Sequence, residues 1–192
     1  MKHFEPFFSI ITPFFNAENF IPKYIEKLKL QSFKNWECII VDDYSEDNGY
    51  FLIKELCSND ERFKIHKNTF QKKIRGPYQA RNFGLSLSKG KYICFLDIDD
   101  YWKDNMLEIK QKILTKENSI DIIFTDISKC TKGIEKGIIA PIKYIPFSYQ
   151  LKIHNPIWLS TSTVKRNLIL NHRFKCINHE DYLFWAELIR DK

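Results

Sequence analysis

The chain turns from apolar to acidic within one stretch, Tyr92-Ile93-Cys94-Phe95-Leu96-Asp97-Ile98-Asp99-Asp100-Tyr101-Trp102. The apolar half is rich in β-branched and aromatic residues and predicts a buried strand. Three carboxylates follow within four positions, and their mutual repulsion requires a cationic group close by. A hard divalent cation, bound through oxygen ligands together with substrate phosphates, meets that requirement. We take this strand and its acidic end as the predicted centre of a functional site.

The composition predicts one globular domain over residues 1–192, because 44% of the 192 residues are hydrophobic and 15% are aromatic. The net charge of +6 suits a nucleic acid, an anionic membrane surface or an anionic small substrate, although scattered basic residues equally describe a solvated face. The five cysteines lie far apart without a Cys-x-x-Cys pair, as expected in a reducing cytoplasm. The apolar run over residues 7–15 is too short for a membrane span.

Strand and helix patterns alternate along the first two thirds of the chain. Apolar runs predict strands over residues 8–12, 37–41, 92–96 and 121–125, the first of them stopped by Pro13, and a short further strand is expected over residues 63–66. Apolar residues at helical spacing predict helices over residues 20–28, 49–56, 80–87 and 105–117. This alternation predicts an α/β fold with a mostly parallel sheet covered by helices on both faces.

The pattern is weaker after residue 133. We expect a strand over residues 138–140, a short helix over 145–153, a strand over 156–164 and a final helix after 178–181. In a parallel sheet, ligands bind beyond the carboxyl ends of the strands. The loops after Thr12, Val41 and Leu96 are therefore predicted to converge on one crevice.

Asp42-Asp43 closes the second predicted strand, and two interpretations are open. Asp and Ser are favoured in turns that cap a following helix. A carboxylate can also accept the imide N–H of a uracil or thymine base.

Asp97-x-Asp99-Asp100 also has more than one interpretation. A strand followed by Asp-x-Asp places the nucleophile of haloacid-dehalogenase-type phosphatases, but those proteins usually carry Thr or Val at the position of Tyr101 and place the motif on an early strand. We favour metal-assisted binding of a diphosphate, with Asp99 as the direct ligand. Capping of the next helix explains Asp100 alone.

Glu180-Asp181 opens the last predicted helix. Acidic residues in a first turn interact well with the helix dipole, and an ionised carboxylate there also suits a general base. His179 is interpreted as a local hydrogen-bonding residue, because the other histidines are isolated and form no metal cluster. The sequence lacks a Walker P-loop, Gly-x-Gly-x-x-Gly and Gly-x-Ser-x-Gly, so the usual support for a kinase, a dinucleotide oxidoreductase or an α/β-hydrolase is missing.

Five segments, in this order, resemble the family 2 glycosyltransferases of the GT-A fold. They are Ser9-Ile10-Ile11-Thr12-Pro13-Phe14-Phe15-Asn16, Val41-Asp42-Asp43-Tyr44-Ser45-Glu46-Asp47, Ala80-Arg81-Asn82-Phe83-Gly84, Phe95-Leu96-Asp97-Ile98-Asp99-Asp100 and His179-Glu180-Asp181-Tyr182. The resemblance implies an inverting, metal-dependent transferase that moves a sugar from a UDP- or dTDP-sugar in surface polysaccharide or lipopolysaccharide synthesis. Its acceptor would be a saccharide or a lipid-linked sugar, and nucleic acid would not be a partner.

The resemblance also implies a role for each matching residue. Pro13 and Phe15 would pack against the base and ribose, and Asp43 would hold the base. Asp97 would lie near the ribose and metal, and Asp99 would ligate Mn²⁺ or Mg²⁺. The remaining implied roles are phosphate binding by Arg75 or Arg81, and deprotonation of the acceptor hydroxyl by Asp181.

Two departures and one alternative accompany these roles. Tyr44 stands where the family commonly has Gly, which predicts a different turn. Phe15 replaces a common Tyr but keeps its stacking face. Many relatives continue past the Glu-Asp helix with a segment over the acceptor, so a non-catalytic nucleotide-sugar-binding remnant is the alternative. Trp158 and residues 160–163 are expected on the acceptor side, where Trp158 is either a platform for stacking of a sugar or a core residue. Peripheral membrane association and a homo-oligomer are both left open.

Overall fold

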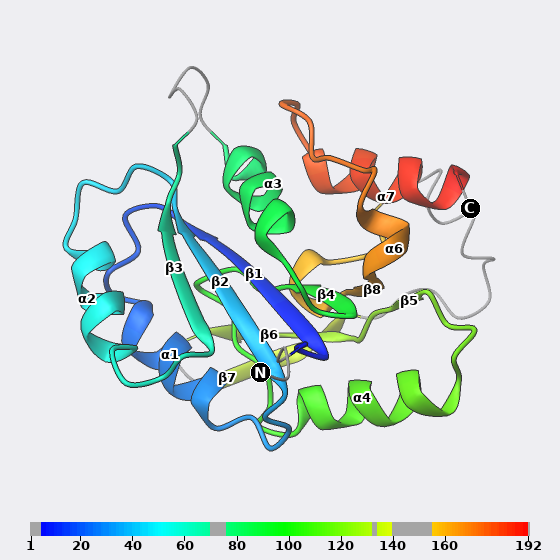
Figure 1. Ribbon diagram of the computed structural model, residues 1–192, viewed down its shortest axis with the longest axis horizontal. Coiled ribbons are helices and arrows are strands. Elements are labelled where there is room, and N and C mark those ends of the chain that lie inside the picture. The colour runs from blue at the N-terminus through cyan, green and yellow to red at the C-terminus, as the bar shows by residue number, and fades with distance from the viewer. Residues whose placement is uncertain (1–4, 70–75, 132–133, 140–154, 192) are drawn as a thin grey trace.

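A computed structural model describes residues 5–69, 76–131, 134–139 and 155–191. Its centre is a six-stranded sheet in the order β3-β2-β1-β4-β8-β5 (Figure 1). Neighbours among β1, β2, β3 and β4 pair in parallel, and β8 runs antiparallel to both β4 and β5. The bounds are β1 Phe8–Phe14, β2 Trp36–Asp42, β3 Phe63–Lys67, β4 Tyr92–Phe95, β5 Ile122–Ile123 and β8 Thr163–Lys165. The predicted mostly parallel sheet is confirmed.

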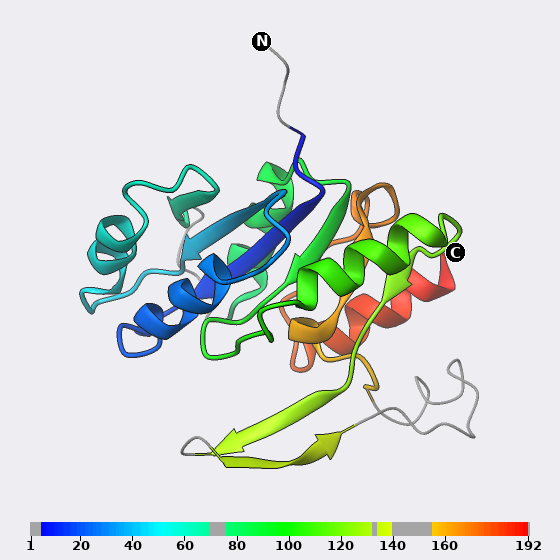
Figure 2. The same cartoon turned by 90° about the horizontal axis from the view of Figure 1, so that it is seen from below.

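Helices cover both faces of this sheet (Figures 1 and 2). They are α1 Ile21–Lys29, α2 Gly49–Leu56, α3 Tyr78–Leu87, α4 Met106–Lys116, α6 Arg166–Ile169 and α7 Glu180–Arg190, with the short 3-10 helix η1 at Leu159–Thr161. Successive strand side chains point to opposite faces. Ile10 and Cys94 therefore share a core with α1, α2 and α4, whereas Ile11, Ile93 and Phe95 share one with α3 and α7.

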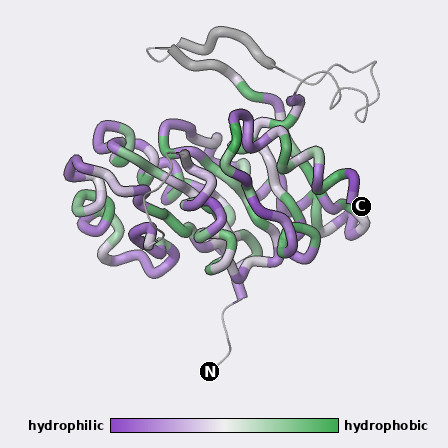
Figure 3. The backbone as a smooth tube through the Cα atoms, turned by 90° about the horizontal axis from the view of Figure 1, so that it is seen from above, coloured by the Kyte–Doolittle hydropathy of each residue, from purple (hydrophilic) through white to green (hydrophobic). Residues whose placement is uncertain are grey.

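The strands in the middle of the molecule, β1, β2 and β4, contribute to the core on both faces of the sheet. Hydrophobic residues are frequent along these central strands, and hydrophilic residues are frequent along the outer turns (Figure 3). Every residue of β1, β2 and β4 is buried. Continuous burial is what a sheet covered on both faces requires. The rigid centre fixes where the carboxyl ends of β1, β2 and β4 lie.

The prediction that Pro13 stops the first strand is wrong, because β1 continues to Phe14. Ile11 accepts a hydrogen bond from Leu96 N–H on the β4 side, so the nitrogen of Pro13, two residues on, faces the same side. Pairing of β1 with β4 ends at Ile11 and Phe95. The missing N–H of proline therefore removes no bond between strands.

The later part of the chain departs further from the predictions. The expected strand over residues 121–125 is reduced to β5, and most of the expected strand over 156–164 is coil and η1, followed by β8. A hairpin of β6 (Ile127–Thr131) and β7 (Ile134–Ile139) extends away from the sheet, and β7 overlaps the strand expected over 138–140 (Figure 2). The helix expected over 145–153 lies outside the described residues. Within the described ranges, no helix is long and apolar enough to cross a membrane.

Candidate functional site

Two neighbouring cavities open beyond the carboxyl ends of the parallel strands. The first, which we call the β1 cavity, has a volume of about 420 Å³ and is lined by the end of β1 and the loops after β1, β2 and β4, including Pro13, Phe15, Asp43, Tyr44, Asp97 and Asp99. The second, the α7 cavity, has a volume of about 590 Å³ and is lined by Asp100, Trp158, Ser160, Ile177, Glu180 and Asp181, among others. Arg81 and Asp97 line both cavities. The predicted convergence of the three loops is confirmed.

The loops after β1 and β2 are joined by hydrogen bonds. The backbone N–H of Asn16 donates to Ser45 Oγ at 3.0 Å, and Glu46 N–H donates to Asn16 Oδ1 at 2.7 Å. Asn16 and Tyr44 have φ values of 47° and 65°. Tyr44 thus adopts the left-handed conformation that glycine favours, although it carries a side chain. Both loops are held in a defined shape at the rim of the β1 cavity.

Asp43 is half-buried on the wall of the β1 cavity. Asn68 Nδ2 donates to Asp43 Oδ1 at 2.7 Å, and Asn68 N–H donates to the carbonyl of Asp42 at 2.8 Å. Asn68 is itself buried, at 5% exposure, so it fixes the orientation of the Asp43 carboxylate. Sequence reasoning missed Asn68, because it follows a short strand and carries no recognisable motif.

The acidic loop after β4 divides between the two cavities. Asp99 is exposed and lines the β1 cavity, whereas Asp100 lines the α7 cavity. Asp97 N–H donates to Ser160 Oγ at 3.1 Å, which ties the loop to η1. Burial raises the pKa of Asp100, and a hydrogen bond with Ser160 partly offsets that rise. The three carboxylates therefore occupy chemically different positions.

Arg81, on α3, lies between the two cavities. Its Nη2 is 2.8 Å from Asp97 Oδ1, and its Nη1 donates to Glu180 Oε1. The residue is 6% exposed, and its Nε is buried without a hydrogen-bond partner among the described residues. Burial raises the pKa of Glu180, and the charge of Arg81 opposes that rise. Sequence reasoning did not find the contact with Glu180, which joins residues 99 positions apart.

Asp181 lies in the first turn of α7 and lines the α7 cavity. Asn155 Nδ2 donates to Asp181 Oδ2 at 2.6 Å. His179, just before the helix, has a φ of 56° and no side-chain capping hydrogen bond. The left-handed residue turns the chain sharply into α7, so that both Glu180 and Asp181 reach the cavity.

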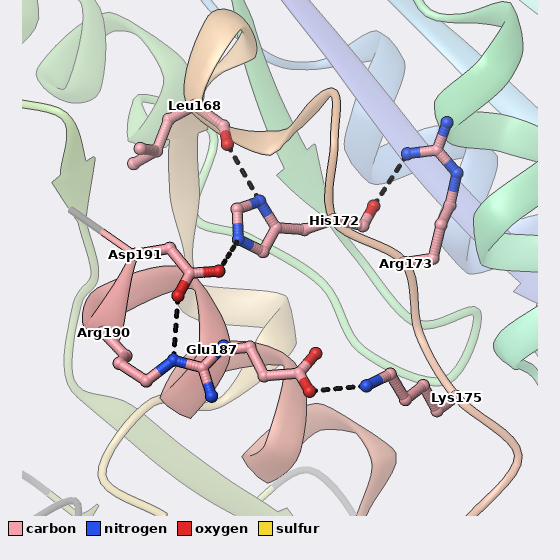
Figure 4. Close-up of polar contacts among 7 residues, drawn as sticks. All are labelled: Leu168, His172, Arg173, Lys175, Glu187, Arg190 and Asp191. Carbon is pink, nitrogen blue, oxygen red and sulfur yellow. Dashed lines mark hydrogen bonds and ion pairs between the residues drawn. The ribbon is translucent and has the colours of Figure 1, made fainter.

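The far end of α7 is anchored separately (Figure 4). Lys175 Nζ is 2.5 Å from Glu187, and His172 Nε2 is 3.3 Å from Asp191. The middle of the helix is held by packing, with the rings of Phe174 and Phe184 stacked at 4.1 Å between centroids. The helix that carries Asp181 is therefore fixed along its length by contacts of different kinds.

Trp158 is 46% exposed and Ile177 is 49% exposed, and both line the α7 cavity. Of the two interpretations left open for Trp158, a core residue is excluded by this exposure. The cavity wall thus carries apolar surface as well as carboxylates, which suits a ligand with one apolar and one polar side.

Comparison with known proteins identifies the family. The family model described as "Glycosyl transferase family 2" matches residues 9–169. The chain belongs to glycosyl transferase family 2. One similar curated protein is the Escherichia coli UDP-Glc:alpha-D-GlcNAc-diphosphoundecaprenol beta-1,3-glucosyltransferase WfgD, 33% identical over 95% of this chain and 70% of that protein. Another is the putative teichuronic acid biosynthesis glycosyltransferase TuaG of Bacillus subtilis, 35% identical over 73% of this chain and 56% of that one.

Solved structures share the fold of this family 2 chain. TarS of S. aureus, residues 1–349, in complex with UDP, has a TM-score of 0.76 at 23% identity and matches 94% of this chain. The mannosyltransferase PcManGT from Pyrobaculum calidifontis, in complex with GDP-Man and Mn2+, has a TM-score of 0.71 at 16% identity. The chain spans about half the length of these two proteins, 54% and 52%. The expected GT-A fold is confirmed.

The carboxylates of this family 2 chain fit a metal ion that is shared with a ligand. Within the described ranges, no three His, Cys, Asp or Glu side chains are grouped so that they hold a metal alone. Asp97 and Asp99 both line the β1 cavity. One or two carboxylates completed by phosphate oxygens is the usual arrangement for Mg²⁺.

The predicted site residues fall into two groups in the structure. Six of them line the β1 cavity, namely Pro13, Phe15, Asp43, Arg81, Asp97 and Asp99. Asp181 lies in the α7 cavity instead. Their roles stay predictions, and Arg75 lies outside the described residues.

Proposed function

We propose that this chain transfers a sugar, with inversion, from a UDP- or dTDP-sugar to a hydroxyl of a saccharide or lipid-linked acceptor in cell-surface polysaccharide synthesis. One observation carries the proposal: two adjoining cavities, one with Asp43 and Asp99 and the other with Asp181, meet at Asp97. A group-transfer enzyme needs two substrates in contact at one point. The relatives named for UDP-glucose, for a diphosphoundecaprenol acceptor and for teichuronic acid synthesis support it.

The β1 cavity takes the donor nucleotide in this proposal. Phe15 is 48% exposed and offers a ring face to the base, with Pro13 beside it. The Asp43 carboxylate, oriented by Asn68, accepts the imide N–H that uracil and thymine both carry. Cytosine has no such donor at the same ring position, so the proposal favours UDP and dTDP.

The diphosphate lies toward Asp97 and Asp99 in this proposal. Asp99 would hold Mn²⁺ or Mg²⁺, with Asp97 beside it. A bound divalent ion supplies positive charge that offsets the charge growing on the departing nucleoside diphosphate. Without an ion or Arg81 nearby, these carboxylates would repel a diphosphate.

The α7 cavity takes the acceptor. Asp181 accepts the proton of the acceptor hydroxyl while the hydroxyl oxygen attacks the anomeric carbon from the face opposite the diphosphate. The bond to the diphosphate breaks, and the configuration at that carbon inverts. Trp158 supplies an exposed ring on which an acceptor sugar can stack.

The test is release of UDP from a panel of UDP-sugars by the purified chain with Mn²⁺, with and without a lipid-linked GlcNAc diphosphate. We expect one donor to give acceptor-dependent release of UDP and a new glycosidic product. UDP binding with no release from any donor would favour the non-catalytic alternative. Absence of binding to both UDP and dTDP would contradict the proposal itself. The expected cytoplasmic location stays a prediction.

A further inference from the structure

Arg81 joins the two cavities by two ion pairs. One pair is made with Asp97, in the acidic loop of the β1 cavity, and the other with Glu180, the first residue of α7. The Arg81 side chain is buried, at 7% exposure, the Glu180 side chain is partly buried, at 12% exposure, and the Asp97 side chain is 34% exposed. Both terminal nitrogens of Arg81 thus already have carboxylate partners. An arginine that only binds phosphates would not need both terminal nitrogens paired with carboxylates of the protein.

We propose that Arg81 and Glu180 are positioning residues that couple the donor side of the site to the placement of Asp181 on the acceptor side. The inference rests on the proposed function, because it assumes that a nucleoside diphosphate binds near Asp97. The path has three contacts: from the acidic loop to Arg81, from Arg81 to Glu180, and along the backbone from Glu180 to Asp181.

The chemistry of the arginine side chain suits this role. A guanidinium is planar and rigid and can hold two carboxylates at once in fixed directions, which a lysine ammonium on a flexible stem does not do. Removing one partner from a buried charged pair is costly, because the remaining charge is left uncompensated. A movement of Asp97 is therefore expected to be followed by Arg81 and Glu180.

Contacts along the rest of α7 are expected to confine the proposed coupling to the start of the helix. The far end of the helix is held by Lys175 and His172, which pair with Glu187 and Asp191 (Figure 4). These contacts lie several turns from Arg81 and do not involve the acidic loop. A signal from the donor side is expected to change the first turn of α7 and to leave the last turn as it was.

The test measures amide hydrogen exchange of the folded chain with and without UDP and Mn²⁺. In the unsubstituted protein, we expect UDP with Mn²⁺ to slow exchange over residues 182–186 by about threefold or more. In Glu180→Gln we expect that slowing to disappear, while isothermal titration gives a UDP affinity within about threefold of the original. A purely structural role would change exchange equally with and without UDP.

Glu187→Gln is the matched control, because it makes the same substitution in an ion pair at the other end of α7. It should keep the UDP-dependent slowing over residues 182–186. Arg81→Lys keeps the positive charge but loses the planar guanidinium that can hold two carboxylates. It should therefore lose the UDP-dependent slowing of exchange, as Glu180→Gln does. If Glu180→Gln fails to fold, the Arg81→Lys variant still tests whether the two ion pairs couple the cavities.

Three results would overturn the inference. If UDP binds to the unsubstituted protein without slowing amide exchange over residues 182–186, this inference is overturned and the proposed function is not. The same holds if the slowing is unchanged in Glu180→Gln. A loss of UDP affinity well beyond tenfold in Arg81→Lys would make Arg81 a direct phosphate ligand. Failure of the unsubstituted protein to bind either UDP or dTDP would overturn the proposed function as well.

Discussion

Asp181 is the residue on which the proposed chemistry depends most. It lines the α7 cavity and not the β1 cavity, in which we propose that the base and diphosphate bind, and its carboxylate accepts a hydrogen bond from Asn155. An asparagine at this position keeps the shape and one acceptor oxygen but cannot take a proton. The role of Asp181 as a base can therefore be separated from donor binding.

We predict that Asp181→Asn lowers the turnover number for sugar transfer by about 10²–10⁴-fold, the usual contribution of a general base. The affinity for UDP, measured by isothermal titration, should stay within about twofold. Asp191→Asn, at the other end of the same helix, serves as a control that leaves turnover intact. A large loss of UDP affinity in Asp181→Asn would contradict the assignment.

Single residues also show where sequence reasoning was sufficient. Phe15, Asp43, Asp97 and Asp99 were predicted to meet from three separate loops, and they do line one cavity. The prediction was possible because the carboxyl ends of parallel neighbours lie at one edge of a sheet. The partners Asn68 and Asn155 could not be predicted, because each reaches a carboxylate through a hydrogen bond between distant segments. Ser160 was expected near the acceptor side, but its hydrogen bond with Asp97 N–H was not.

At the scale of elements, η1 supports the acidic loop and is itself supported from α4 and from the segment just before α4. Trp102 Nε1 donates to the Ser160 carbonyl at 2.6 Å, and Lys110 Nζ donates to the Thr161 carbonyl at 3.2 Å. The Lys110 ammonium also lies 4.6 Å from the centroid of the Trp102 ring. Burial lowers the pKa of Lys110 from its ordinary value of 10.5. The side chain is 1% exposed, so this support includes a buried amine.

The pKa of Lys110 predicts how stability depends on pH. In the folded state the pKa is lower than in the unfolded state, so the cost of burying the charge is present in full below the folded value. As the pH rises through that value toward 10.5, the folded chain releases its proton first and becomes more stable relative to the unfolded chain. Stability should therefore rise with pH in that window.

Lys110→Met removes this dependence, because methionine has a similar length and no charge. We predict that the free energy of unfolding of the unsubstituted protein rises relative to Lys110→Met when the pH goes from 7 to about 10. Urea unfolding of both proteins at both pH values measures it, and other titrating groups cancel in the difference. An unchanged difference, or a change of the opposite sign, would contradict a lowered pKa.

Elements whose outcome differed from the sequence prediction lie mostly in the last third of the chain. Three of the four parallel strands, β1, β2 and β4, were identified because each is a largely apolar run that is buried along its whole length. The fourth, β3, is short and partly exposed. The run from Pro156 to Val164 was interpreted as a strand, but Trp158 points into a cavity and the chain coils into η1 before β8. A short segment that lines a cavity lacks the hydrophobic periodicity from which strands and helices are predicted.

Across the whole molecule, the proposed function assigns the β1 cavity to the donor side of the site and the α7 cavity to the acceptor side. The acidic stretch after β4 contributes to both, with Asp99 in the β1 cavity and Asp100 in the α7 cavity. Buried strands fix the donor side, whereas the start of α7 and the loop before it form much of the acceptor side. Substitutions in the two cavities should therefore separate nucleotide binding from transfer.

Isothermal titration of UDP, with Mn²⁺ and with a chelator, tests the central claim most directly in the unsubstituted protein and in Asp99→Ala. We predict that Mn²⁺ tightens UDP binding to the unsubstituted protein by about tenfold or more, which corresponds to one strong charge interaction. Asp99→Ala should bind UDP weakly and equally with and without Mn²⁺. Equal UDP affinity with and without Mn²⁺ in the unsubstituted protein, or a full Mn²⁺ effect in Asp99→Ala, would contradict the account.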